Sequence, residues 1–194
     1  MSEKLKQSLK EAKVVMFDEY CYMIHPLLDG FPKIDPILLD EVSTRMVGII
    51  KQWDDFDVVL TIEAMGIHLA TAVCLKMDKP LLIIRKRRYG LKDEQELFQK
   101  TGYGKFSLFL NGLNINSRVV VIDDVISTGG TLRAVLPALI KRDVKVLGVV
   151  ALIDKSGISN QLQKEFCLPV VPLEYVKVSS KGVKIVSKEQ AGNG

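Results

Sequence analysis

The sequence predicts a single α/β domain with a central parallel sheet flanked by helices. One indication is an alternation that starts near Asp57, where the apolar runs 58–62 and 81–84 read as buried strands on either side of a helical segment, 67–76. Another is the run 119–122, four consecutive β-branched residues that suit a strand buried on both faces. A chain of 194 residues is long enough for one such domain to bury about 70% of its unfolded surface.

The remaining elements are predicted from the spacing of apolar residues and from turn residues. Leu5 and Leu9, four positions apart among charges, predict a short helix within 2–10. Pro36 suits the first position of a helix that runs to about Gln52. Further strands are expected at 14–24, 106–110 and 146–153, and further helices at 130–142 and 158–166. Two more strands, 170–178 and 183–186, are expected to form a terminal hairpin.

One connection is unusually long. Residues 85–105 contain seven Lys or Arg and three Gly, with little periodicity. Long connections without regular structure are uncommon inside compact domains unless they are functional. We therefore predict a flexible lid loop, in which Tyr89 and Tyr103 help to exclude water from a reaction site.

Composition argues against several classes of function. The chain has 27 Lys and Arg against 23 Asp and Glu, and this net charge of +4 is too weak to indicate nucleic-acid binding. No apolar run approaches the roughly 18 residues that span a bilayer. Cys21, Cys74 and Cys167 are widely spaced in apolar surroundings, as expected of thiols in a reducing compartment. We expect a cytoplasmic protein that binds neither nucleic acid nor membrane.

The most informative stretch follows the strand 119–122. Two adjacent carboxylates come first, Asp123 and Asp124, and the residues before the next helix are Ser127, Thr128, Gly129, Gly130 and Thr131. The first turn of a helix has unpaired backbone N–H groups and the positive end of the helix dipole. Glycines let a phosphate approach that backbone closely, and hydroxyl groups add donors. This loop therefore predicts an anion site.

The two carboxylates cannot bind the same phosphate, because like charges repel. They must instead face hydroxyl groups, a metal ion or another cation. A ribose 5-phosphate satisfies both halves, with its phosphate in the loop 127–131 and its 2- and 3-hydroxyls on Asp123 and Asp124. The alternative is an ordinary strand-to-helix turn in which the Asp pair caps the helix. The complete string of acids, hydroxyls and glycines favours the ligand site.

The run 121–131, Val-Ile-Asp-Asp-Val-Ile-Ser-Thr-Gly-Gly-Thr, resembles the phosphoribosyl pyrophosphate signature of type I phosphoribosyltransferases. That signature is an apolar run, two acids, two apolar residues, a variable residue, Thr-Gly and a terminal Thr. The resemblance extends over most of the chain and is strongest to archaeal purine enzymes, the hypoxanthine/guanine phosphoribosyltransferases. It implies the type I phosphoribosyltransferase fold in one domain, with a small hood from about 1–56 and 158–190 and a core from about 57–157.

Two further loops follow predicted parallel strands, where ligands are expected in an open α/β sheet. The first resembles the family's pyrophosphate loop, which a non-proline cis peptide often holds, and consists of Glu63, Ala64, Met65 and Gly66. The second carries the cations Arg85, Lys86 and Arg88. Arg binds phosphate with two N–H groups and Lys with a point charge. The family has a similar Arg-Lys pair, which implies a catalytic role for Lys86. A structural turn and solvated surface charge are the alternatives.

The purine base is expected near Phe31 and Asp154. The segment 28–36 is similar to the hood of adenine phosphoribosyltransferases, where backbone and an aromatic ring hold the purine, and a plain helix lead-in is the alternative. Asp154 ends the last predicted parallel strand, and a carboxylate there would accept from purine N–H groups. Many 6-oxopurine enzymes have an Asp at the position of Ser127, close to purine N7, so the identity of a general acid stays open.

The resemblance implies a Mg2+-dependent transfer of the 5-phosphoribosyl group from phosphoribosyl pyrophosphate to a purine base, with hypoxanthine or guanine favoured and adenine as the alternative. Asp123 and Asp124 would hold Mg2+ indirectly or through the ribose hydroxyls, and the enzyme is expected to be a homodimer. An alternative of another class is a transcription regulator that senses phosphoribosyl pyrophosphate. Such a regulator needs a DNA-binding module, and 1–56 shows no clear helix-turn-helix with a basic face.

Overall fold

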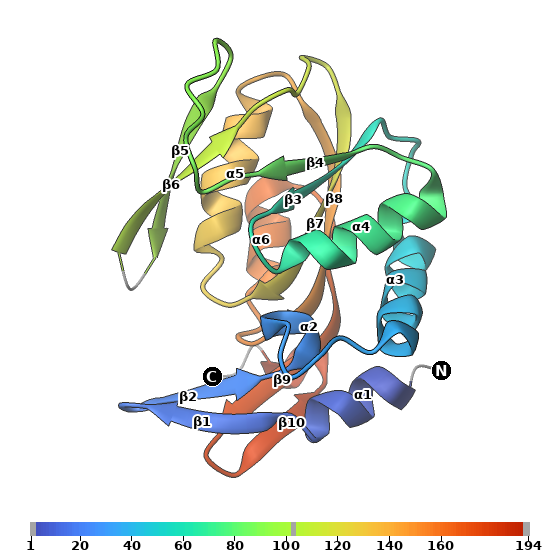
Figure 1. The fold of residues 1–194 in the computed structure, drawn as a ribbon, viewed down its shortest axis with the longest axis vertical. Helices are drawn as coiled ribbons and strands as arrows, with labels where there is room; N and C mark the ends of the chain where they lie inside the picture. The colour runs from blue at the N-terminus through green and yellow to red at the C-terminus, as the bar shows by residue number, and fades with distance from the viewer. Residues whose placement is uncertain (1–2, 102–103, 192–194) are drawn as a thin grey trace.

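A computed structural model of the protein describes residues 3–101 and 104–191. Its centre is a six-stranded sheet in the order β10-β9-β8-β7-β3-β4 (Figure 1). The strands from β9 to β4 are parallel, and β10 joins the edge antiparallel to β9. The α/β fold with a central parallel sheet is therefore confirmed. Within the described residues, no helix is both long and apolar enough to cross a membrane.

The strands of this sheet are β3 (Val58–Ile62), β4 (Leu81–Ile84), β7 (Arg118–Ile126), β8 (Lys145–Asp154), β9 (Val170–Ser179) and β10 (Gly182–Val186). β3 and β4 begin and end where the sequence places them. β7 was expected to end before the acidic pair, but it continues through Asp123 and Asp124. It continues because Val125 and Ile126 still pair with Ile153 and Asp154 of β8, so the partner strand carries the ladder past the apolar run.

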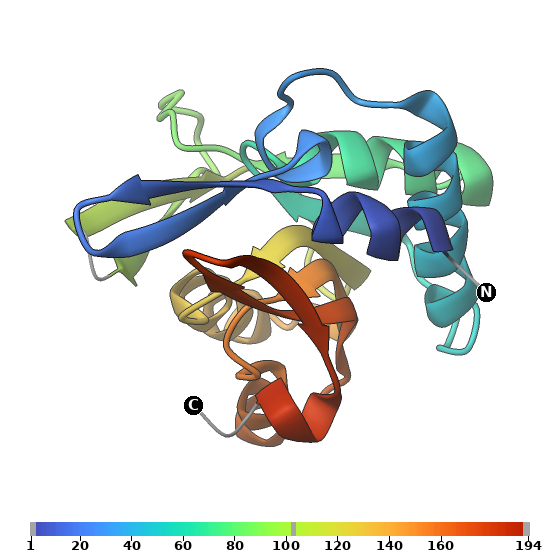
Figure 2. The same ribbon diagram turned by 90° about the horizontal axis from the view of Figure 1, so that it is seen from below.

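Helices cover both faces of the sheet (Figures 1 and 2). One face packs against α3 and α4 and the other against α5 and α6, which span Pro36–Ile50, Gly66–Met77, Gly130–Ile140 and Ser159–Phe166. Val120 of β7 belongs to the core on the α3 and α4 side, whereas its neighbour Val121 belongs to the core on the α5 and α6 side. Successive strand residues face opposite layers, which is why β7 reads as an unbroken apolar run.

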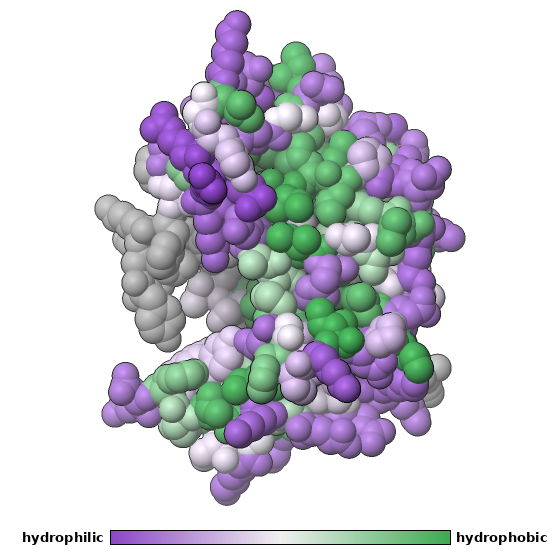
Figure 3. All heavy atoms as spheres, viewed as in Figure 1, coloured by the Kyte–Doolittle hydropathy of each residue, from purple (hydrophilic) through white to green (hydrophobic). Residues whose placement is uncertain are grey.

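Two antiparallel hairpins and three short helices complete the fold. The hairpins are β1 (Lys13–Phe17) with β2 (Tyr20–Ile24), and β5 (Gln95–Thr101) with β6 (Gly104–Leu110); the helices are α1 (Glu3–Lys10), α2 (Pro26–Asp29) and α7 (Lys188–Ala191). The β1–β2 hairpin and α1 lie together with β10 at the lower end of the molecule (Figures 1 and 2). Apolar surface gathers over this hairpin, where Met16, Phe17 and Tyr20 are exposed (Figure 3).

Much of the segment predicted as a lid loop is a β-hairpin. Residues 95–101 pair with 104–110, and the expected strand 106–110 is the second arm. The first arm escaped prediction because it is mostly polar and shows no alternation. Arg85 joins the hairpin to the end of β4, since its N–H and C=O groups both bond to Phe109, with N···O distances of 3.0 and 2.6 Å. Tyr103 lies outside the described residues, and the flexibility of the segment stays a prediction.

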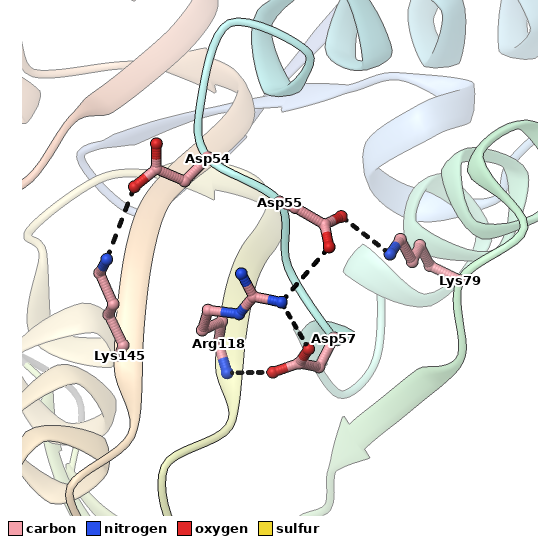
Figure 4. A network of polar contacts seen from close by, with 6 residues as sticks. All are labelled: Asp54, Asp55, Asp57, Lys79, Arg118 and Lys145. Carbon is pink, nitrogen blue, oxygen red and sulfur yellow. Dashed lines mark hydrogen bonds and ion pairs between the residues drawn. The ribbon is translucent and has the colours of Figure 1, made fainter.

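Charged side chains join the turn after α3 to the amino ends of the sheet strands, far from the loops that bear the motifs (Figure 4). Arg118 Nη2 lies 3.3 Å from Asp55 Oδ2 and 3.1 Å from Asp57 Oδ1, and its backbone N–H donates to Asp57 Oδ2 at 2.7 Å. Lys79 pairs with Asp55 at 3.0 Å. Hydrogen bonds from Lys79 and Arg118 hold the pKa values of Asp55 and Asp57 below the usual range. The network fixes where β3 and β7 begin.

We expect Arg118→Gln to lower the melting temperature by a few degrees at neutral pH. Because the folded-state pKa values of Asp55 and Asp57 lie below 3.8, their pairing stabilises the fold fully above that value and is lost as the pH falls through the lowered values. The difference in melting temperature between wild type and Arg118→Gln should therefore shrink as the pH is lowered from about 7 to about 3. Thermal denaturation measures it, with Lys6→Gln as the charge control. A pH-independent difference would contradict the prediction.

Candidate active site

The loops that were predicted to bind ligand meet at one edge of the sheet. β4, β3, β7 and β8 are parallel neighbours, so the residues that follow them, 85–88, 63–66, 127–131 and 155–158, leave the sheet at the same edge. The end of α2 reaches this edge as well. A Cβ placed on Gly30 would lie 3.7 Å from the methyl carbon of Met65. We refer to this edge of the sheet, with its four loops and the end of α2, as the crevice.

The loop 127–131 joins β7 to α5 as a tight, glycine-rich turn. Gly129, the residue directly before α5, has a φ of 74°, a left-handed conformation that glycine adopts at little cost. A Cβ at Gly129 would lie 3.0 Å from Arg133 Nη1 and 3.1 Å from Leu162 Cδ2, so the turn is packed closely from behind. Arg133 Nη1 also donates to the carbonyl oxygen of Thr128 at 2.9 Å. The backbone N–H of Gly130, the first residue of α5, points into the turn and lies 3.4 Å from Thr128 Oγ1.

The two carboxylates lie in the last part of β7. Asp123 is 6% exposed and Asp124 is half-buried, and the backbone N–H of Asp124 donates to Asp123 Oδ1 at 3.0 Å. Burial raises the pKa of both carboxyl groups, and the charge of Asp124 raises that of Asp123 further. Such a pair is stabilised by hydroxyl donors or by a cation that a ligand brings. The role of this pair in ligand binding stays a prediction.

The loop after β3 fits tightly against β7. Its Glu63–Ala64 peptide bond is cis, as the resemblance to the family implies. A Cβ on Gly66 would overlap Thr61 Oγ1 and lie 3.2 Å from the carbonyl oxygen of Ile122. Thr61 Oγ1 itself donates to that carbonyl at 2.8 Å. Glycine at position 66 thus lets α4 begin directly beside the strand that carries the carboxylates.

Glu63 holds the cations of the neighbouring loop. Its Oε2 accepts from Arg85 Nε at 2.7 Å and from the backbone N–H of Lys86 at 3.0 Å, and these bonds lower its pKa. A carboxylate repels a phosphate, so Glu63 acts on an anion through the two residues that it positions. Lys86 is exposed at the crevice edge. Arg88 is exposed too, and its Nε lies 3.7 Å from a carboxylate oxygen of Glu94, within the turn that precedes β5.

Asp154 is placed differently from the sequence prediction. Its side chain is fully buried and accepts from the backbone N–H groups of Ser156, Gly157 and Ser159 at 2.9, 2.8 and 2.9 Å. Both oxygens therefore shape the loop between β8 and α6, and a role at the purine edge is not supported. The same loop is tied to the phosphate loop, because Ser156 Oγ donates to the carbonyl oxygen of Ser127 at 2.5 Å.

The next residue, Lys155, enters the crevice although the sequence analysis did not single it out. Its Nζ lies 5.3 Å from the centroid of the Tyr22 ring, and Tyr22 donates its hydroxyl to Asp29 Oδ1 at 2.5 Å. Burial lowers the pKa of Lys155, while the charges of Asp29 and Asp124 act in the opposite direction. Phe31, on the loop after α2, is 63% exposed, and its part in base binding stays a prediction. No sequence pattern links residues this far apart.

A metal site made by protein side chains alone is not found among the described residues, where no three His, Cys, Asp or Glu are gathered. Mg2+ takes oxygen ligands and usually keeps water or substrate phosphate oxygens in its coordination sphere. The adjacent side chains of Asp123 and Asp124 supply carboxylate oxygens, the ligand type that Mg2+ prefers. It fits an ion whose other ligands come from a bound phosphate compound or from water.

Comparison with known proteins gives the family. The model of the phosphoribosyl transferase domain matches residues 33–171. The hypoxanthine/guanine phosphoribosyltransferase of Methanosarcina barkeri is 46% identical over 187 residues, which cover 95% of this chain and 96% of the relative. The hypoxanthine/guanine phosphoribosyltransferase of Methanocaldococcus infernus is 42% identical over 185 residues, which cover 95% of this chain and 100% of the relative.

Solved structures share the fold. The adenine phosphoribosyltransferase of Thermoanaerobacter pseudethanolicus matches with a TM-score of 0.74 at 16% identity, over 89% of this chain and 99% of that one. The adenine phosphoribosyltransferase of Rhodothermus marinus matches with a TM-score of 0.72 at 22% identity, over 89% and 97%. At such identities the likeness concerns the fold alone. With the domain model over most of its length and relatives at 42% and 46% identity, this chain belongs to the phosphoribosyltransferase family.

Proposed function

We propose that the protein transfers the 5-phosphoribosyl group of phosphoribosyl pyrophosphate to hypoxanthine or guanine, giving a nucleoside monophosphate and pyrophosphate. The observation that carries the proposal is the helix-start loop 127–131 directly after the buried pair Asp123 and Asp124. The archaeal relatives bear the name of this activity. Adenine is the second candidate base, since adenine phosphoribosyltransferases share the fold.

Each part of the donor has a matching part of the crevice. The 5-phosphate accepts from backbone N–H groups at the start of α5, whose dipole favours an anion. The ribose hydroxyls donate to Asp123 and Asp124. The pyrophosphate meets the backbone of the loop 64–66 and the two cations that Glu63 holds, Arg85 and Lys86.

The reaction breaks the bond between the anomeric carbon and a pyrophosphate oxygen and forms a bond from that carbon to a purine nitrogen. As the first bond lengthens, the sugar gains positive charge and the pyrophosphate gains negative charge. Carboxylates beside the sugar and the cations Arg85 and Lys86 beside the leaving group stabilise both charges. Catalysis thus consists mainly of placement and electrostatics.

We propose Mg2+ as the cofactor. Asp123 and Asp124 would hold it through water or through the ribose hydroxyls, with diphosphate oxygens of the donor as further ligands. The ion would supply charge neutralisation for the diphosphate. The resemblance to the family also supports a homodimer. Cys21, Cys74 and Cys167 are free thiols, in keeping with a place in the reducing cytoplasm.

Lys155 favours a 6-oxopurine over adenine. An ammonium group offers only hydrogen-bond donors, so its partner on the base must be an acceptor such as the 6-oxo oxygen of hypoxanthine or guanine. The 6-amino group of adenine is itself a donor, and the two groups would be left without a hydrogen bond. The Tyr22 ring beside Lys155 adds a flat apolar surface.

Assays with adenine, guanine, hypoxanthine and xanthine as separate acceptors test the function. With one donor concentration, kcat/KM for guanine and hypoxanthine should exceed that for adenine by at least about tenfold. A preference for adenine would overturn the choice of base. If the protein binds the donor but releases no pyrophosphate when a purine is added, the alternative of a transcription regulator that senses phosphoribosyl pyrophosphate would be favoured.

Replacing both Asp123 and Asp124 by Asn should reduce turnover by at least about 100-fold, because the sugar and the cation lose their charged partners. The fold should remain, since the change removes two buried like charges. Steady-state kinetics and thermal denaturation measure the two effects. Asp78→Asn, at the end of α4, is the control. Near-normal turnover by the folded double variant would refute the assignment.

Gly129→Ala should weaken donor binding by at least about tenfold, since a Cβ stiffens and crowds the turn that receives the phosphate. Gly112→Ala is a matched control, because Gly112 has a φ of 71° and a Cβ there would lie 3.9 Å from its nearest neighbour, a methyl carbon of Leu82. Titration calorimetry with phosphoribosyl pyrophosphate compares the variants. Equal donor affinities in the Gly129→Ala and Gly112→Ala variants would contradict the assignment of the 5-phosphate to this loop.

A further inference from the structure

Asp29 joins the hood to the crevice through both of its carboxylate oxygens. It is the last residue of α2, where Oδ2 accepts from the backbone N–H of His25 at 2.8 Å and Oδ1 accepts from the Tyr22 hydroxyl at 2.5 Å. Burial and the neighbouring Asp29 raise the pKa of Tyr22, so the hydroxyl keeps its proton and remains the donor. A carboxylate bonded in this way fixes the direction of the Tyr22 ring.

The support beneath Asp29 is rigid. His25 is fully buried, its Nδ1 accepts from the backbone N–H of Leu27 at 3.2 Å, and its Nε2 lies 2.6 Å from Ser8 Oγ of α1. Since Nδ1 is an acceptor, Nε2 carries the proton and donates to Ser8. Burial lowers the pKa of His25 to about 4, so the ring is neutral at pH 7. The position of Asp29 is therefore set by the hood itself.

Lys155 is the point at which this network reaches the crevice. Its backbone N–H donates to the carbonyl oxygen of Ile126 at 2.9 Å, which anchors it beside β7, and its Nζ lies over the Tyr22 ring. The carboxylates of Asp29 in the hood and Asp124 in the core both favour its charge. Within the part of the chain that the structure describes, its ammonium group has no hydrogen-bond acceptor. Because Lys155 is only half-buried, its ammonium group can donate to a ligand that binds beside it.

We propose that Asp29 is a positioning residue for the purine base: it orients the Tyr22 ring, and this ring and the Lys155 ammonium over it meet the base. The inference rests on the proposed function and deepens it. The phosphate loop is anchored on β7 and α5, whereas Asp29 belongs to α2 and bonds to Tyr22 and to the backbone of His25. Loss of Asp29 therefore acts on ligand affinity through the base and not through the phosphate.

Two ligands separate these effects, because guanosine 5'-monophosphate and ribose 5-phosphate share the sugar phosphate and differ by the base. Calorimetry should show that Asp29→Ala weakens the nucleotide about tenfold, the size of one lost charge-assisted hydrogen bond, and changes ribose 5-phosphate by less than about twofold. Tyr22→Phe, which removes only the hydroxyl, should act in the same direction. Asp29→Asn keeps an acceptor for Tyr22 and should stay within about threefold of wild type.

The controls distinguish this inference from the function on which it rests. Glu19→Ala removes an exposed acid at the tip of the β1–β2 hairpin and should leave both affinities unchanged. Equal losses for both ligands in Asp29→Ala, or an unchanged nucleotide affinity in both Asp29→Ala and Tyr22→Phe, would overturn the positioning role while wild-type turnover with purines stands. Wild-type protein that binds both ligands equally and releases no pyrophosphate with any purine would overturn the proposed function instead.

Discussion

The parallel pairing of β7 with β3 on one side and β8 on the other fixes nearly every group in the crevice. Residues 119–122 of β7 are completely buried between the two helical layers, so the strand cannot shift without opening both cores. Both neighbours run parallel to it, with one register shift against β8 between Val119 and Val120, and their loops must leave the sheet at the same edge. Because Gly66 has no side chain, the loop after β3 can lie directly against β7. The phosphate loop, the pyrophosphate loop and the Lys155 loop are therefore placed by one set of backbone hydrogen bonds.

The acidic and the basic side chains of the crevice are held by different parts of the fold. The acids Asp123 and Asp124 belong to the central strand, whereas Arg85 and Lys86 belong to an outer loop and are held by Glu63. Buried carboxylates and exposed cations suit a substrate that is polarised during reaction, with a positive sugar and a negative leaving group. Lys155 lies over the Tyr22 ring, on a different loop from Arg85 and Lys86.

Features that depend on neighbours in the chain were predictable. The bounds of β3 and β4 follow from apolar runs with turn residues at each end, and the phosphate loop follows from hydroxyls and glycines before a helix. Prediction failed where a partner strand decided the outcome. β7 extends past its acids because β8 continues beside it, and the polar arm β5 forms because β6 supplies its ladder. A carboxylate at the end of a parallel strand, such as Asp154, can either contact a ligand or bind its own loop. Here the turn after β8 folds back, and its backbone N–H groups bond to both carboxylate oxygens.

By itself, the sequence determined the fold class, the glycine-rich turn before α5 and the family, because periodicity and the spacing of glycine and hydroxyl residues act over a few residues. The tertiary structure alone decided that Lys155 lies over the Tyr22 ring and that Tyr22 bonds to Asp29. These residues come from the β8–α6 loop, β2 and α2, and only the packing of β2 and α2 against that loop brings them together. The role of a side chain in such a site depends on which distant groups surround it, and burial and hydrogen-bond partners are properties of the folded chain, not of its local pattern.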